Sequence, residues 1–168
     1  ISSAAHVAGM KAAKPGSFEY EVESAIEHVY LANGAMTPGY PSIVGSGPNA
    51  CVLHYRANNA PVRKGDLLLC DAGAEYALYA SDITRTFPVN GRFSGPQRDV
   101  YEIVLAAQAA ARNATRPGAH WNQPHDAAVK VLAQGMIDLG LVKGSLDAVL
   151  ENGDYRRFYM HRTGHWLG

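Results

Sequence analysis

Two aspartates beside apolar segments are the residues of this sequence best placed to do chemistry. Asp71 directly follows the apolar run 67–70, and Asp82 directly precedes the run that starts at Ile83. An ionised carboxylate next to a buried strand is costly unless it is paired or binds a metal. The two lie 82 − 71 = 11 residues apart, so they converge only if the chain folds back between them. Because aspartate also caps turns, spacing alone leaves both interpretations open.

Three histidines extend this candidate site. His165 is a third possible metal ligand, since neutral imidazole commonly binds metals. A second histidine, His161, lies four positions before it. His54 and His161 each interrupt an apolar run and could hydrogen-bond a substrate and stabilise a reaction intermediate. Carboxylate and imidazole ligands suit Mn, Co, Fe or Zn better than thiolates would. The alternative, histidines satisfied within the core, stays open at this point.

The remaining sequence predicts helices and short strands that would position these residues. Hydrophobic spacing and Pro-Gly breaks predict a helix over the first dozen residues, a second one from Glu19 to Asn33, and a Pro- and Gly-rich loop from Thr37 to Asn49. His120 and His125 flank a later helix start, where we expect both to be solvated. Further strands are predicted at 51–55, 67–70, 75–79, 83–89 and 158–161, and further helices at 96–114, 123–139 and 146–150.

The order of these elements indicates an internal duplication. In each copy an Ala-rich helix, a Pro-Gly break and a second helix lead to a strand that carries a histidine. The intervals are 54 − 15 = 39 residues from Pro15 to His54 and 161 − 117 = 44 residues from Pro117 to His161. The first copy continues through a meander to Val89, whereas the second ends seven residues after His161, so we expect its strands to be missing.

Composition narrows the class of protein. The chain has 15 basic and 15 acidic residues and no basic cluster, so we expect no nucleic-acid partner, and no apolar run approaches the roughly 18 residues that span a bilayer. We expect Cys51 and Cys70 to be buried thiols, which favours the reducing cytoplasm. The chain begins at Ile1 within a helix and ends at Gly168 after an apolar segment, so we expect it to be part of a longer protein.

Four motifs together resemble one family. The first motif combines residues 44–47 with 53–55, and the second and third are the runs 71–76 and 79–91. The fourth combines residues 157–161 with 165–168. In this order and spacing they resemble the Xaa-Pro aminopeptidase (aminopeptidase P) family of metallopeptidases. The resemblance implies an α+β class, pita-bread (creatinase/aminopeptidase-like) fold, which is a duplicated unit of helices and an antiparallel meander, here with an incomplete second half. Residues 1–168 would then form part of the catalytic domain.

The same resemblance implies roles for individual residues. Asp71, Asp82 and His165 match metal ligands, with Asp82 bridging two divalent ions, for which manganese is the first expectation and Co, Fe or Zn are alternatives. His54 and His161 match histidines that contact the substrate. In the family, a hydroxide between the ions attacks peptides with proline in second position and releases the first residue. A homo-oligomer and a cytoplasmic location are also implied for the intact protein.

Some features of the family have no counterpart here. The resemblance places two glutamate ligands and a further histidine beyond Gly168, and an N-terminal domain before Ile1, so we expect the chain alone to be inactive. Arg162 and Thr163 stand where many relatives have Gly-Leu, which leaves the substrate-facing detail open. Two alternatives also remain, a prolidase that cleaves Xaa-Pro dipeptides on the same fold and a binding module that has lost its metals.

Overall fold

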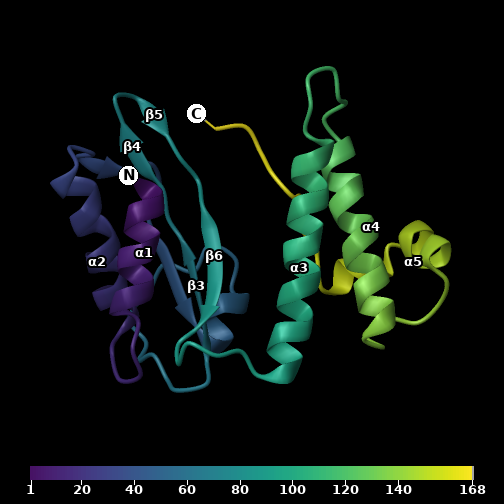
Figure 1. Cartoon of the computed structure of the whole chain (residues 1–168), viewed down its shortest axis with the longest axis horizontal. Helices are drawn as coiled ribbons and strands as arrows, with labels where there is room; N and C mark the ends of the chain where they lie inside the picture. Colours follow the sequence, from purple (N-terminus) through teal and green to yellow (C-terminus); the bar gives the residue numbers. More distant parts are fainter. Residues whose placement is uncertain (168) are drawn as a thin grey trace. The chain divides into compact units, whose positions relative to one another are not determined.

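The structure is a computed structural model that describes residues 1–167, and its chain forms two compact units. The first is built on residues 1–94 and contains helices and strands, and the second is built on residues 95–166. Figure 1 shows the first unit in purple to teal and the second in green to yellow. Each unit is described by itself below.

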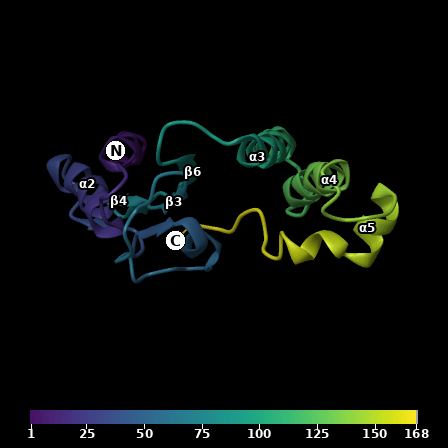
Figure 2. The ribbon, with the colours of Figure 1, turned by 90° about the horizontal axis from the view of Figure 1, so that it is seen from below.

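Two packed helices open the first unit, and both match the sequence prediction. Helix α1 (Ser2–Ala12) stops before Pro15, and α2 (Glu19–Ala32) begins with a capping box in which the Phe18 amide donates to the Glu21 carboxylate at 2.7 Å. Helix α2 buries one side chain per turn, Val22, Ile26 and Tyr30. The two helices run side by side (Figures 1 and 2).

Two small antiparallel sheets complete the first unit. One has the strand order β2 (Ile43–Ser46), β3 (Leu67–Asp71), β6 (Thr84–Pro88), and the other has the order β1 (Thr37–Pro38), β4 (Ala74–Tyr76), β5 (Tyr79–Ala80). In the first sheet Asp71 lies opposite Ile43 on one side and Thr84 on the other. Val44, Leu68 and Cys70 point from it into a core shared with α2.

The sheets differ from the sequence prediction in two places. Strand β2 lies inside the segment that we expected to be a loop, because Gly45 and the flanking turn residues hide its short apolar run. The segment predicted as one strand at 75–79 is a hairpin whose two turn residues, Ala77 and Leu78, have φ values of 51° and 69°. Such turns favour Asn-Gly, so Ala-Leu gave no turn signal.

The predicted strand at 51–55 is wrong, and His54 therefore lies on a turn and not on a strand. The chain forms a 3₁₀ helix, η1 (Gly47–Cys51), and then a turn closed by the Tyr55 amide donating to the Val52 carbonyl at 3.2 Å. Val52 and Leu53 are exposed, so the apolar run was not a core strand. Cys51 is also exposed, which corrects the expectation that both thiols are buried; Cys70 is buried as expected.

A buried carboxylate holds this loop in place instead of a strand ladder. Glu19 is fully buried, and its two oxygens accept hydrogen bonds from five groups, at 2.7 to 3.1 Å: the Ser46 amide and hydroxyl, the Asn49 side chain, the Tyr55 hydroxyl and the Ala60 amide. Burial by itself would raise the pKa of Glu19, but the hydrogen bonds from Ala60, Asn49 and Ser46 bring the pKa below its ordinary value of 4.5.

The regular structure of the second unit consists of helices within residues 95–166. Helices α3 (Gly95–Ala114), α4 (Gln123–Asp138) and α5 (Leu146–Asn152) match the predicted helices, and a 3₁₀ helix, η2 (Asp154–Arg157), follows. Ala107 and Ala111 of α3 belong to the same buried core as Leu132 and Met136 of α4 and Val149 of α5. The predicted strand at 158–161 is wrong: Phe158 and Met160 are exposed, and residues 95–166 contain no strand with which it could pair.

The helix pair of the predicted duplication is therefore present in both units. Its strands occur only in the first unit within residues 1–167, as expected for an incomplete second copy. None of the helices in this described part is long and apolar enough to cross a bilayer.

A first prediction concerns Gly73, which lies where the chain turns back from β3. A Cβ atom there would lie 1.6 Å from the carbonyl oxygen of Ser81, so backbone must move to admit it. We expect Gly73→Ala to lower the free energy of unfolding by about 1–3 kcal/mol, as overpacking does, measured by urea denaturation. Gly95→Ala, where a Cβ meets open space, is the matched control, and equal stability of both variants would contradict the close approach.

A second prediction follows from the lowered pKa of Glu19. Its ionisation stabilises the fold fully above the pKa of the unfolded chain, and this contribution is lost as pH falls through the lower pKa of the folded state. Below about pH 4.5 we therefore expect the free energy of unfolding to fall less steeply in Glu19→Gln than in the wild type. Denaturant titrations at several pH values measure this, and parallel curves would refute it.

Candidate functional site

The two aspartates singled out by the sequence lie together at one end of the β3–β6 pair. Asp71 ends β3, the β4–β5 hairpin reverses the chain, and Asp82 precedes β6. Two backbone hydrogen bonds close this reversal, from the Ala72 amide to the Ile83 carbonyl and from the Ser81 amide to the Ala74 carbonyl, both at 3.1 Å. The fold-back that convergence required is therefore present, formed by the ten residues 72–81 between the two aspartates.

A tyrosine that the sequence analysis did not identify joins the two carboxylates. The Tyr40 hydroxyl lies 2.6 Å from Oδ1 of Asp71 and 2.9 Å from Oδ1 of Asp82. Burial raises the pKa of this phenol, and the hydrogen bond to Asp71 raises it further, so the hydroxyl stays protonated and donates. Tyr40 lies in the irregular segment between β1 and β2, where no periodicity marks a functional side chain.

This arrangement fits a divalent metal ion. Two carboxylate oxygens converge on a point where the tyrosine supplies one proton, so a cation would offset the charge repulsion between them. Oxygen ligands of this kind suit Mn and other hard or borderline cations. Among residues 1–167, no group of three or more His, Cys, Asp and Glu side chains is placed to hold a metal.

Helix α1 supports the strand ends that carry these carboxylates. His6 is buried and its Nε2 donates to the carbonyl oxygen of Ala72, one residue after Asp71, at 3.0 Å. Ser2, also on α1, accepts from the Ala74 amide at 3.0 Å and bonds the Ser81 hydroxyl at 2.7 Å. His6 therefore fixes the backbone beside the candidate site.

His54 lies in the same unit, on the turn that replaces the predicted strand. Its side chain is exposed, and its backbone has a φ of 53°, a left-handed conformation that is strained for a residue with a Cβ. The sequence placed His54 inside a core strand, and the structure places it on a surface turn whose next residue, Tyr55, is tied to Glu19.

His161 and His165 lie in the second unit, on the irregular segment that follows η2. Nδ1 of His161 lies 2.9 Å from the Arg162 carbonyl, and Nδ1 of His165 lies 2.7 Å from the Trp166 carbonyl. Because a carbonyl only accepts, each Nδ1 carries the proton, which leaves Nε2 as the lone-pair nitrogen that could bind a metal or accept from a substrate. Gly168, the last residue of this motif, lies outside the described residues.

A polar cluster in the second unit holds this histidine-bearing segment. Thr163 bonds His125 Nδ1 at 3.0 Å and the Tyr159 hydroxyl at 2.7 Å, and Arg162 donates to the Asn122 side chain at 2.5 Å. Burial lowers the pKa of His125, and the positive charge of Arg162 lowers it further. His125, which we expected to be solvated, is partly exposed and in addition bonds Thr163, one of the two residues that depart from the family pattern.

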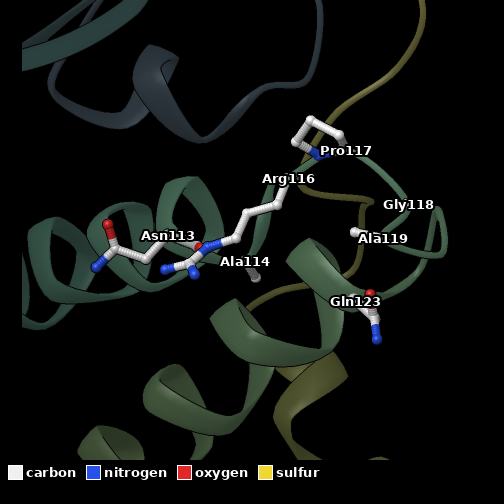
Figure 3. A pocket seen from close by; sticks show the side chains of 7 residues that line it. All are labelled: Asn113, Ala114, Arg116, Pro117, Gly118, Ala119 and Gln123. Carbon is white, nitrogen blue, oxygen red and sulfur yellow. The ribbon is translucent and has the colours of Figure 1, made fainter.

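The hollow at the turn between α3 and α4 offers less chemistry. Figure 3 shows its lining, in which Arg116 is the one ionisable side chain among the seven residues around it. The Arg116 guanidinium donates to the carbonyl of Asn113 in its own turn, at 2.8 Å. This hollow therefore belongs to the Pro-Gly break and not to the candidate site.

Comparison with known proteins relates the chain to one family of peptidases. Residues 1–168 match the model of metallopeptidase family M24. The chain is 50% identical to the Xaa-Pro aminopeptidase of Haemophilus influenzae and 44% identical to that of Escherichia coli, over 100% of its own length but only 39% and 38% of theirs. It thus spans about two fifths of these curated relatives.

Solved structures show the same fold. The chain is similar to the aminopeptidase PepP of Pseudomonas aeruginosa, with a TM-score of 0.98 and 51% identity over 99% of this chain and 38% of that one. It is also similar to a zinc-substituted Escherichia coli aminopeptidase P in complex with product, with a TM-score of 0.97, 44% identity and the same coverage. The helices and sheets described above are therefore part of a pita-bread fold, and the chain belongs to metallopeptidase family M24.

Proposed function

We propose that the protein containing this chain is a metal-dependent aminopeptidase that releases the first residue from peptides with proline in second position. The convergence of Asp71 and Asp82 on the Tyr40 hydroxyl carries the proposal, because it supplies the paired carboxylates of a metallopeptidase centre. The names of the relatives in Haemophilus influenzae and Escherichia coli, both Xaa-Pro aminopeptidases, support this substrate class.

In this proposal the carboxylates hold the metal centre with His165. Asp71, Asp82 and His165 would hold two divalent ions, with manganese favoured by the chemistry of the ligands. When bound, such ions lower the pKa of water to about 7 and polarise the carbonyl that is attacked. Tyr40 orients the two carboxylates through its short hydrogen bond to Asp71.

His54 and His161 would bind and orient the peptide. Both side chains are exposed, so a substrate can reach them. The hydrogen bond from Nδ1 of His161 to the Arg162 carbonyl fixes its tautomer and leaves Nε2 to accept a hydrogen bond from a substrate N–H. Their role would be to stabilise the charge that develops on the scissile carbonyl or amide.

The remaining features of the intact protein are proposals as well. Residues 1–168 would be part of the catalytic domain, and the other metal ligands would come from sequence outside this chain, as the covered share of the relatives suggests. Cys51 and Cys70 are both free thiols, which supports a reducing compartment such as the cytoplasm. We also propose a homo-oligomer for the intact protein.

Two other functions are compatible with the same fold. A prolidase would use the same carboxylates on Xaa-Pro dipeptides, and only substrate length separates it from an aminopeptidase. A binding module without metals is less favoured, because it would have no use for two carboxylates held together by Tyr40.

A third prediction tests the substrate class. We expect the full-length gene product, loaded with manganese, to cleave a Xaa-Pro-Xaa tripeptide with at least about tenfold higher kcat/KM than a Xaa-Pro dipeptide. Release of the first residue, followed by chromatography, measures both reactions side by side. Preference for the dipeptide would make the protein a prolidase, and turnover of neither would support the binding module. Residues 1–168 alone should show no turnover.

A fourth prediction tests the metal centre directly. Asp82→Asn removes one charged ligand, so we expect the full-length protein to bind less manganese and to lose at least about 100-fold in kcat/KM. Metal content after dialysis, measured by inductively coupled plasma mass spectrometry, provides a readout besides activity. Asp99→Asn, on an exposed position of α3, is the matched control. Full manganese content in Asp82→Asn would exclude Asp82 as a ligand.

A further inference from the structure

From the hydrogen bonds of the first unit we infer that Glu19 is a positioning residue, which acts by holding the turn that presents His54 to the substrate. The inference rests on the proposed role of His54. It assigns a function to a residue that lies on α2, outside the candidate metal centre, and that touches no substrate itself.

The contacts of Glu19 all lead to one loop. Its carboxylate is completely buried, and its five donors come from residues 46–60, the segment that contains His54. Oε1 takes the donors at the start of the loop, on Ser46 and Asn49, and Oε2 takes those further along, on Tyr55 and Ala60. One carboxylate therefore ties the two ends of the loop together.

One of the residues that bond Glu19 is the direct neighbour of His54 in the sequence. The next residue, Tyr55, donates its hydroxyl to Oε2 of Glu19 at 2.8 Å, and its hydroxyl also accepts from Asn49 at 3.1 Å. His54 holds a φ of 53°, which a residue with a side chain adopts only when its surroundings enforce it. The anchored tyrosine ring on one side and the Val52 carbonyl bond on the other provide that enforcement.

Glu19 is not needed to start the helix on which it lies. The exposed Glu21 closes the capping box of α2 by accepting from the Phe18 amide, while both oxygens of Glu19 are directed to the loop. All the hydrogen bonds that the Glu19 carboxylate accepts come from the loop. We therefore infer that Glu19 organises the loop and not the helix. Substitution of Glu21 thus offers a control that weakens α2 without touching the loop.

The experiment is a double-mutant cycle in the full-length, manganese-loaded protein, with a Xaa-Pro-Xaa tripeptide. Glutamine at position 19 keeps the size of the side chain, but its amide group must face either the Ser46 and Asn49 donors or the Ala60 amide. We expect Glu19→Gln to lower kcat about 10- to 100-fold, with manganese content unchanged. In a His54→Ala background the same substitution should change kcat less than about twofold.

Two further variants keep the test informative. Tyr55→Phe, which removes one hydroxyl and leaves the other contacts of Glu19 in place, should lower kcat in the same direction and lose its effect in the His54→Ala background. Glu21→Gln should leave kcat unchanged. If Glu19→Gln does not fold, the Tyr55→Phe cycle decides the question alone.

The outcomes separate this inference from the proposed function. Equal losses in the wild-type and His54→Ala backgrounds would show a general structural role for Glu19 and overturn the inference only. A loss of manganese from Glu19→Gln would overturn it as well. No tripeptide or dipeptide turnover by the wild-type protein would overturn the proposed function, and the inference would then fall with it.

Discussion

The reversal of the chain between β3 and β6 is the constraint on which the candidate site depends. The backbone passes so close to itself there that Gly73 leaves no room for a side chain against the Ser81 carbonyl. Because β3 and β6 pair antiparallel in register, the end of one and the beginning of the other meet at the same edge of the sheet. Asp71 and Asp82 occupy those two positions, so the topology brings them together.

Much of this arrangement could be predicted from local patterns. The periodicity of Val22, Ile26 and Tyr30 gave α2, and the apolar runs beside the two aspartates gave β3 and β6. Family-like spacing then gave the candidate ligands. These features are local, since a helix face or a strand end depends on residues only a few positions away.

Two of the errors occur where distant polar contacts decide the structure. The segment at 51–55 has the composition of a strand. However, the Tyr55 side chain donates to Glu19, which lies 36 residues earlier, and this bond helps to hold the segment as a turn. Tyr40 was missed for the same reason, because its partners Asp71 and Asp82 are 31 and 42 residues away. No pattern within a window of the sequence contains such pairs, so only the fold reveals them.

The first unit stabilises the negative charge of its carboxylates in two different ways. Glu19 has five protein donors for its two oxygens, so its charge is stabilised without any ion and its pKa is lowered despite burial. Asp71 and Asp82 instead converge on one hydroxyl, that of Tyr40. A carboxylate surrounded by donors serves the structure, because adding a cation would displace bonds already made. Asp71 and Asp82 place two like charges around one hydroxyl, a repulsion that a bound cation would offset, and this difference is the physical basis for proposing a structural role for Glu19 and a metal-binding role for the aspartates.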